Sequence, residues 1–504
     1  MTIAGRWLCA TLAGALVSGA AWAQVAPWPD AAEDFGGPDY TITIQEEGKE
    51  KKPMGMPEKL APPKAEVDSA PDCPAPANGS RCCQPNGNGC GEKSGGNGCC
   101  KKKKKKNGKK KNGCAKNGCG NGNGCAEEEN GENGCCEEEE EEEECKCYCY
   151  LFGPEEAVNL WDEMWSHCDD ECKPCVRFGG WLQSGYTSEN DPLSRTRGDL
   201  LSFNDVPDQL NLHQGWFWAE KAVDTEEQCF DWGFRVDVVY GTDAQKTQAF
   251  GNPPPPGPEG WDNEWDHGIY GWAIPAAYGQ VAYNDLTVTL GHFYTRMGYE
   301  VVASTGNFFF THALTHFNSE PFTHTGVIAD YKVHDELSVM VGWTAGWDTG
   351  FDQFEDGSMF HGGFTYQITE DCKLSYMTCV GDFGRRGKEA YYHSIILDMN
   401  LTDHWQWVVH NDILNIEEDF TGAPLNDDAQ AIVNYLFYKV NDCWKFGVRG
   451  EWWQTNGTSH HGVSYGVNYR PHANLVIRPE VKHYWSPGLD DREDLFAVDG
   501  IFTW

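Results

Sequence analysis

The chain has 504 residues, a formal net charge of −38 and an aromatic content of 13% that includes 21 tryptophans. This strong negative charge argues against nucleic acid or an anionic membrane surface as a partner. The length suits two to four ordinary domains or one large barrel. After residue 23 no stretch holds 18 uninterrupted apolar residues, so we expect no transmembrane helix.

Residues 1–23 have the pattern of a secretory signal peptide. Arg6 precedes an apolar run, and the stretch Ala21-Trp22-Ala23 fits a small-x-small cleavage site. We therefore expect the mature chain to be exported, with its cysteines in an oxidising compartment.

Residues 24–150 form a low-complexity region that we expect to be disordered. Its first part is rich in proline and charge, and residues 73–149 hold 14 of the 22 cysteines, a lysine run and a glutamate run. Such a composition cannot build an apolar core. Two alternatives remain for the cysteines, which are disulfide cross-links and a metal-binding tract of soft thiolates.

Residues 151–175 differ from this region, because Val158, Trp161 and Trp165 recur at helical spacing after an acidic turn. The pattern predicts a short amphipathic helix. A cluster of potential zinc ligands overlaps it: His167, Cys168, Cys172 and Cys175. In an exported chain, disulfide pairing is the default for such cysteines.

From residue 176 to the end the sequence predicts strands, most of them about 9–11 residues long, the length that crosses a bilayer at a tilt. Sixteen are expected, roughly at 176–186, 211–221, 230–240, 276–283, 286–294, 322–332, 337–347, 359–369, 373–381, 390–401, 404–414, 429–440, 443–453, 462–470, 474–484 and 494–504.

The segment 230–241 (FDWGFRVDVVYG) shows why lipid is the expected surroundings of these strands. Alternate residues are large and apolar, and the residues between them are mostly charged or glycine. Trp and Tyr stand at many strand ends, where their apolar rings and polar tips suit the lipid–water boundary. Small and charged residues on the other face suit a water-filled interior.

The connections alternate between short turns and long loops, and the strand number is even. This is the layout of a bacterial outer-membrane barrel, with turns in the periplasm and loops outside. The sequence thus predicts an all-β fold: a closed antiparallel transmembrane β-barrel at 176–504, preceded by the low-complexity Cys-rich segment. Closure removes the unpaired edges that lipid does not tolerate.

A barrel of this size is wide enough to enclose an aqueous channel for passive diffusion of small hydrophilic solutes or ions. The charged residues on inward positions are the pore-lining candidates: Asp231, Arg235, Asp237, Lys445, Arg449, Glu451, Arg478, Glu480 and Lys482. The alternative is that they pair with each other in ladders across neighbouring strands. Because acidic residues outnumber basic ones in the strand region, we expect a mild cation preference.

The long connection 295–321 is the candidate constriction loop. Its apolar residues would be exposed to water unless the loop folded inward. These residues are Phe308, Phe309, Phe310 and Leu314. The alternative is that the loop covers the barrel mouth or forms a subunit contact.

Three cysteines, Cys229, Cys372 and Cys443, fall at short turns and hence at one rim of the barrel. Their strands are well separated, so we expect them not to pair with each other. Disulfides to cysteines in 73–175 would tether the N-terminal region to that rim.

We expect no catalytic residues, cofactor or metal site. The sequence has no GxSxG motif, and His461 and Ser464 fall on opposite faces of a strand. His312, His316 and His324 could bind a metal, but histidines in a loop are usually solvated.

The chain ends in AVDGIFTW, with Phe502 and Trp504 on one face of the last strand. This resembles the closing strand of outer-membrane proteins, which implies recognition by the barrel assembly machinery through Phe502 and Trp504. The stretches GGWLQSGYT, NLHQGWFWAEKAVD and NFFFTHALTHFNSEPFTHTGV also resemble the beta-barrel porin 2 (OmpL-like) family.

The resemblance implies a porin-like protein embedded in outer-membrane lipid. It does not extend to the Cys-rich segment, but we expect the N-terminal region to lie in the periplasm, on the side of the short turns. A homo-oligomer is expected by analogy with other porins. The alternative function is structural or adhesive, with the Cys-rich arm cross-linking the barrel to other envelope components.

Overall fold

The computed structural model describes residues 176–190, 203–226, 229–249, 261–262, 266–353 and 356–504. The predicted signal peptide, the low-complexity region and the amphipathic helix with its Cys cluster lie outside the described residues. Among the described residues, no helix is long and apolar enough to cross a membrane.

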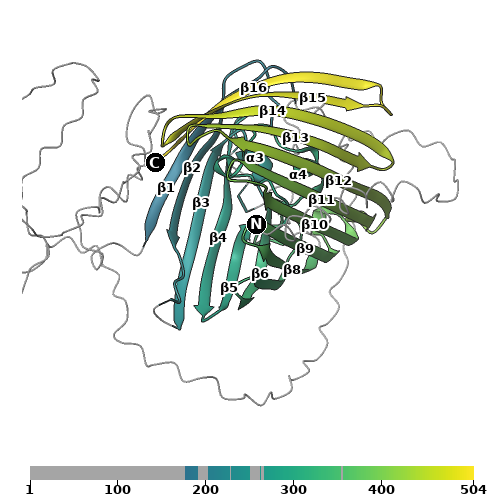
Figure 1. The fold of residues 1–504 in the computed structure, drawn as a ribbon. Coiled ribbons are helices and arrows are strands. Elements are labelled where there is room, and N and C mark those ends of the chain that lie inside the picture. The colour runs from purple at the N-terminus through teal and green to yellow at the C-terminus, as the bar shows by residue number, and fades with distance from the viewer. Residues whose placement is uncertain (1–175, 191–202, 227–228, 250–260, 263–265, 354–355) are drawn as a thin grey trace, which may run out of the picture.

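Sixteen antiparallel strands form one closed barrel (Figure 1). They are β1 (Arg177–Thr187), β2 (Asn211–Lys221), β3 (Phe230–Gly241), β4 (Gly271–Tyr283), β5 (Leu286–Tyr294), β6 (Thr323–His334), β7 (Leu337–Thr344), β8 (Ser358–Thr369), β9 (Cys372–Asp382), β10 (Lys388–Asn400), β11 (Trp405–Glu418), β12 (Pro424–Lys439), β13 (Trp444–Thr455), β14 (Thr458–His472), β15 (Leu475–Ser486) and β16 (Asp491–Thr503). Each strand pairs with its neighbours in the chain, and β1 pairs with β16. Both the strand number and the closure predicted from the sequence are confirmed.

The seam between the first and last strands is a continuous ladder. Trp181 lies opposite Thr503 and Thr187 lies opposite Ala497. The backbones of Gly180 and Trp504 extend the pairing past the end of β16. The seam therefore leaves no free sheet edge, as a lipid environment requires.

The two faces of β3 meet different surroundings, as its alternation predicts. Trp232 is 51% exposed and Val236 is 40% exposed, whereas Asp237 is fully buried. Other strands repeat this exposed apolar face, at Phe217, Leu290, Val341, Trp343, Phe360, Val380, Phe446, Tyr465, Val481, Phe496 and Phe502. An apolar outer surface of this extent is stable in lipid and not in water.

Aromatic pairs lie beside the short turns. The rings of Trp405 and Tyr438 have their centroids 4.7 Å apart, and those of Trp444 and Tyr469 are stacked at 4.3 Å. Trp and Tyr are enriched at membrane interfaces, so these pairs mark the expected boundary of the lipid at the short-turn rim.

Several strands extend beyond their predicted ends on the side of the long loops. The strand β4 begins at Gly271, and β11 and β12 run on together until only residues 419–423 separate them. Their extra residues include acidic side chains that continue the backbone ladder. The apolar alternation stops where the lipid stops, but backbone pairing does not need lipid, so the sequence pattern underestimates these strands.

The short turns are as tight as their Asn and Asp residues suggest. Asn284 has φ of 50°, a left-handed conformation that Asn tolerates, and it joins β4 directly to β5.

Within the described part of the chain, the helical segments all belong to the connections. They are α3 (Ala244–Thr247), α4 (Leu314–Ser319), η2 (Ser304–Gly306) and η3 (Gly384–Arg386). The helix α4 packs against β11, β12 and β13, and Figure 1 shows it within the outline of the barrel. The connection between β5 and β6 therefore reaches the opposite wall.

Candidate functional site

The connection 295–322 folds into the barrel. Phe309 and Phe310 are 3% and 5% exposed, and Leu314 is fully buried. We refer to this connection as the inner loop. Its buried position agrees with the predicted inward fold, and it brings the loop against charged side chains of the wall.

Arg449 on β13 is the central anchor of the inner loop. Its Nη1 donates to Glu300 Oε1 at 2.9 Å and to the carbonyl of Thr311 at 2.7 Å. Its Nη2 donates to the Thr311 hydroxyl and, on the neighbouring strand, to Ser464 Oγ. The guanidinium is fully buried, so these charge-assisted bonds are made without competition from water.

Two wall carboxylates accept hydrogen bonds from the loop backbone. Glu480 Oε2 accepts from the backbone N–H groups of Phe310 (3.0 Å) and Thr311 (2.9 Å). Glu451 Oε2 accepts from the N–H of Leu314 at 2.6 Å. The wall thus satisfies backbone donors that the loop's irregular conformation leaves without secondary-structure partners.

The remaining wall cations bind loop carbonyls. Arg478 donates to the carbonyls of Ser304 (3.1 Å) and Asn307 (2.7 Å), and it also pairs with Asp499 on β16. Lys482 Nζ donates to the carbonyl of His312 at 3.1 Å. Basic side chains therefore hold loop carbonyls while acidic ones hold loop N–H groups.

The three consecutive phenylalanines pack onto glycines of the wall. A Cβ atom added to Gly447 would lie 2.4 Å from the ring of Phe308. One added to Gly185 would lie 2.5 Å from the ring of Phe310. Glycine at these inward positions leaves space for a ring, so wall and loop are complementary in shape as well as in charge.

Glu300, a residue of the inner loop, contacts both another residue of the loop and side chains of the wall. It lies 3.1 Å from His312 Nδ1 and accepts from the hydroxyl of Tyr435. Burial alone would raise the pKa of Glu300, but Arg449 and the His312 contact outweigh burial and hold it well below its ordinary value. Glu300 is therefore ionised and pairs with the Arg449 cation.

The candidates on β3 also have partners. Asp231 pairs with Lys221 at 2.9 Å, and Arg235 pairs with Asp237 at 2.7 Å. Asp237 accepts further bonds from the Trp216 indole and the Tyr294 hydroxyl. These are the cross-strand and same-strand ladders that the sequence left open as the alternative.

Lys445 on β13 is half-buried. Its Nζ lies 4.3 Å from the centroid of the Phe437 ring and 5.6 Å from that of Phe308. The nine candidates thus all belong to strands β3, β13 and β15, and five of them meet around the inner loop. Whether they line the path of a solute remains a prediction.

Several residues of this network were missed by sequence reasoning. Glu300 lies in a loop and carries no periodic signal, whereas Asp499 shares the inward parity of β16 and could have been found. The expectation that loop histidines are solvated was wrong for His312 and His316, which are buried. His324, also buried, lies on β6 and not in a loop. His312 and His316 are buried because the loop folds inward. The same side chains in a loop on the outer surface would be exposed to water.

Ser464 and His461 lie on opposite faces, as predicted. Ser464 is fully buried and bonded to Arg449, while the ring of His461 stacks on Trp485 at 5.1 Å. They cannot act together as a nucleophile and base.

Solved outer-membrane channels are similar in fold to this chain. The channel DcaP of Acinetobacter baumannii is 10% identical, with 65% of this chain and 97% of that chain covered and a TM-score of 0.43. The anion-selective porin from Comamonas acidovorans is 10% identical, covering 65% and 99%, with a TM-score of 0.45. The trimer form of OmpT from Vibrio cholerae is 14% identical, with 65% of this chain and 99% of that chain covered and a TM-score of 0.43. These similarities concern the fold alone, and neither the ion selectivity nor the oligomeric state of this chain follows from them.

The search of curated proteins finds no match. The profile of the family described as "Putative beta-barrel porin-2, OmpL-like" matches residues 175–501, which is more than half of the chain and includes β1 to β15 and all but the last two residues of β16. This confirms the resemblance read from the sequence. The chain belongs to the OmpL-like beta-barrel porin-2 family.

Proposed function

We propose that this porin-family barrel is a channel through which small hydrophilic solutes or ions diffuse passively across the outer membrane. The observation that carries the proposal is the closed sixteen-strand wall, apolar outside and charged inside, with the inner loop bonded across its interior. Such a channel needs no chemical step, because solutes move down their own gradient. The inner loop would set the upper size of the solute, and the wall charges would set the preference for sign.

We further propose a mild preference for cations. The network that holds the inner loop contains four carboxylates and three cations, which are Glu300, Glu451, Glu480 and Asp499 against Arg449, Arg478 and Lys482. Lys482, 3.5 Å from Glu451, offsets part of this charge. An excess of negative charge in a low-dielectric wall raises the local concentration of cations.

Single-channel recording of the purified full chain in planar bilayers tests both statements. We expect discrete conductance steps, and under a salt gradient we expect a reversal potential of the sign that cation permeation gives. Liposome swelling with neutral sugars of increasing size then locates the size limit. An absence of steps from correctly folded barrels would contradict the channel, and a reversal potential of anion sign would contradict the cation preference alone.

The rival function is a structural or adhesive one, and one observation favours it. Cys372 and Cys443, at two turns of the short-turn rim, are disulfide-bonded. The predicted cross-link to cysteines in 73–175 falls outside the described residues. Non-reducing peptide mapping would identify the bonded partners. Disulfide-linked multimers that give no conductance would favour the structural role over the channel.

We also propose how the barrel is oriented in the membrane and how it assembles. The short-turn rim and the N-terminal region face the periplasm, as in other barrels of this kind. Phe502, exposed on the outer face, and Trp504 present the signal that the assembly machinery reads. The barrel forms homo-oligomers. Protease accessibility in intact cells tests which side the N-terminal region faces. Deletion of the last three residues tests the assembly signal, and cross-linking in membranes tests the homo-oligomer.

A further inference from the structure

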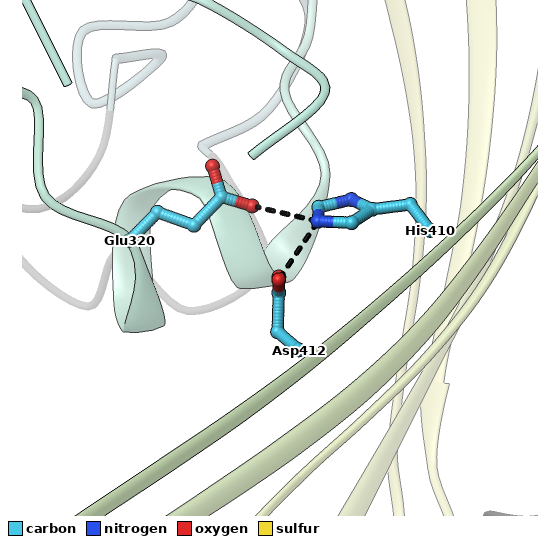
Figure 2. Close-up of side chains that lie close together, drawn as sticks. All are labelled: Glu320, His410 and Asp412. Atoms are coloured by element: carbon cyan, nitrogen blue, oxygen red, sulfur yellow. Dashed lines mark hydrogen bonds and ion pairs between the residues drawn. The ribbon is translucent and has the colours of Figure 1, made fainter. Parts of the chain in front are cut away.

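Three side chains meet where the inner loop returns to the wall. Glu320 follows directly after α4, and His410 and Asp412 stand two residues apart on β11, so they share its inner face. His410 Nε2 lies 2.8 Å from Asp412 Oδ1 and 3.7 Å from Glu320 Oε1. Figure 2 shows both carboxylates turned toward this one ring nitrogen.

The cluster is buried, and it places two carboxylates beside one imidazole. All three side chains are 1% exposed. Two carboxylates so close together in a low-dielectric site repel each other, and a single imidazolium offsets only one of them. The site therefore favours additional positive charge.

One oxygen of the cluster has no hydrogen-bond partner among the described residues. Glu320 Oε1 is buried, it lies beyond hydrogen-bond distance of Nε2, and in Figure 2 it points into the cluster. A buried carboxylate oxygen without a donor is costly. It is the ligand atom that an ion placed among the three residues would satisfy.

Both carboxylates are held in place by surrounding donors. The Thr315 hydroxyl donates to Asp412 Oδ2 at 2.7 Å, and the Tyr392 hydroxyl donates to Oδ1 at 2.8 Å. His316 Nδ1 lies 3.0 Å from Glu320 Oε2. Metal ligands are characteristically oriented by such outer hydrogen bonds.

We propose that Glu320, His410 and Asp412 bind a divalent metal ion of the zinc class. Imidazole nitrogens and carboxylate oxygens are both zinc ligands, whereas calcium and magnesium prefer more oxygens and no imidazole. In a tetrahedral site with bonds of about 2.0–2.2 Å, ligand atoms stand roughly 3.3–3.5 Å apart. The two separations here, 2.8 and 3.7 Å, lie on either side of that value. Ser394 Oγ, 3.1 Å from Nε2, supplies an oxygen for the fourth position.

The bound ion would join the inner loop to β11. Glu320 belongs to the loop, and the other two ligands belong to the wall, so the ion closes a bridge that the direct contact of 3.7 Å does not close. Its charge equals that of the two carboxylates, with His410 neutral.

The test is zinc content of the purified full chain in detergent micelles. The protein is incubated with zinc chloride, passed over a desalting column and analysed by mass spectrometry for metal per chain. Cysteines elsewhere in the chain also bind zinc, so the measured quantity is the difference between variants. We expect Glu320→Gln, Asp412→Asn and His410→Gln each to lose about one ion per chain relative to the wild type.

The matched control is His334→Gln. His334 and Glu336 form an exposed pair of the same chemistry, 2.8 Å apart at the turn between β6 and β7. We expect this variant to keep the full zinc content. Equal zinc in the wild type and in all three cluster variants, each folded by gel mobility, would overturn the proposal.

Anomalous diffraction at the zinc edge gives a second measurement that needs no variant. Crystals of the wild type grown with zinc should show a peak between Glu320, His410 and Asp412, at nitrogen and oxygen distances of about 2.0–2.2 Å and not the 2.3 Å of thiolate ligands. Zinc peaks elsewhere with none at this position would overturn the proposal even if the variants failed to fold.

Discussion

The inner wall of the barrel has two unlike parts, and the inner loop is bonded mainly to one of them. Strands β13 and β15 present Arg449, Glu451, Arg478, Glu480 and Lys482, and each of these side chains is buried. Strands β7, β8 and β9 present mostly small or neutral side chains at inward positions: Ser338, Met340, Thr344, His361, Gly363, Thr365, Ser375 and Met377.

The charged part and the neutral part of the inner wall have different roles. Charged side chains at β13 and β15 hold the irregular backbone of the loop by fixed hydrogen bonds, so we expect them to act on solutes through their electric field and not by direct binding. The neutral part makes weaker contacts, such as the 3.5 Å approach of Thr365 Oγ1 to Ser375 Oγ. We infer that the charged part fixes the loop and that solutes pass on the neutral side.

Deleting residues 303–318 should produce the largest effect. Removal of this part of the inner loop takes away the three phenylalanines and all of α4 except Ser319, so the open cross-section widens. We expect single-channel conductance to rise several-fold. Removing 420–422 from the exposed turn between β11 and β12 is the control and should leave conductance unchanged. Equal conductance of the two deletions would show that the loop does not narrow the pore.

Replacing Arg449 with Met should strongly destabilise the loop. Glu300, Glu451 and Glu480 then lose a buried cation, and breaking a buried ion pair costs about 3–5 kcal/mol. Denaturant unfolding of the barrel in micelles measures the loss. Adding Glu480→Gln should restore part of it, because one unpaired carboxylate is removed.

The control for that prediction is an exposed ion pair between the start of the inner loop and β6. Arg296 pairs with Asp330 at 3.2 Å and is 42% exposed, so Arg296→Met should change stability by no more than about 1 kcal/mol. Similar losses for the two arginines would contradict a division between an anchoring and a neutral part.

Gly447→Ala tests shape without altering charge. The new methyl group would lie 2.4 Å from the Phe308 ring, and the ring must move, at a cost of about 1–3 kcal/mol. Gly450→Ala on the same strand is the control, because nothing lies within 4 Å of its added Cβ. The further change Phe308→Leu should recover stability in the first variant. A loss of equal size in both glycine variants would indicate a general strand effect.

Ser375→Asp should have the smallest effect, and it should be on selectivity alone. If solutes pass along the neutral part, a new carboxylate there increases cation permeability by about twofold or less, without a change in unfolding. Reversal potentials under a salt gradient measure it, with Ser375→Asn as the uncharged control. A fall in stability without a selectivity change would place Ser375 away from the solute path.

The sequence was sufficient for the wall because lipid imposes a local rule. Every second residue of a spanning strand faces lipid, so alternation such as Trp232, Phe234 and Val236 gives the strand and its outer face together. The same rule identified Arg449 and Glu480 as inward residues. It could not extend β4 or β12 to their observed ends, because beyond the lipid the outward positions need not be apolar.

The sequence by itself determined which residues face lipid and which face inward. Its run of phenylalanines, which would otherwise be exposed to water, indicated that the 295–321 connection turns inward. Only the tertiary structure decided which inward residues meet. Arg449 and Glu300 are 149 residues apart, and Glu320 joins His410 across a separation of 90 residues that no spacing rule connects. Contacts between a loop and the wall depend on where the closed barrel places its far side. That placement is a property of the whole sheet and not of any one strand.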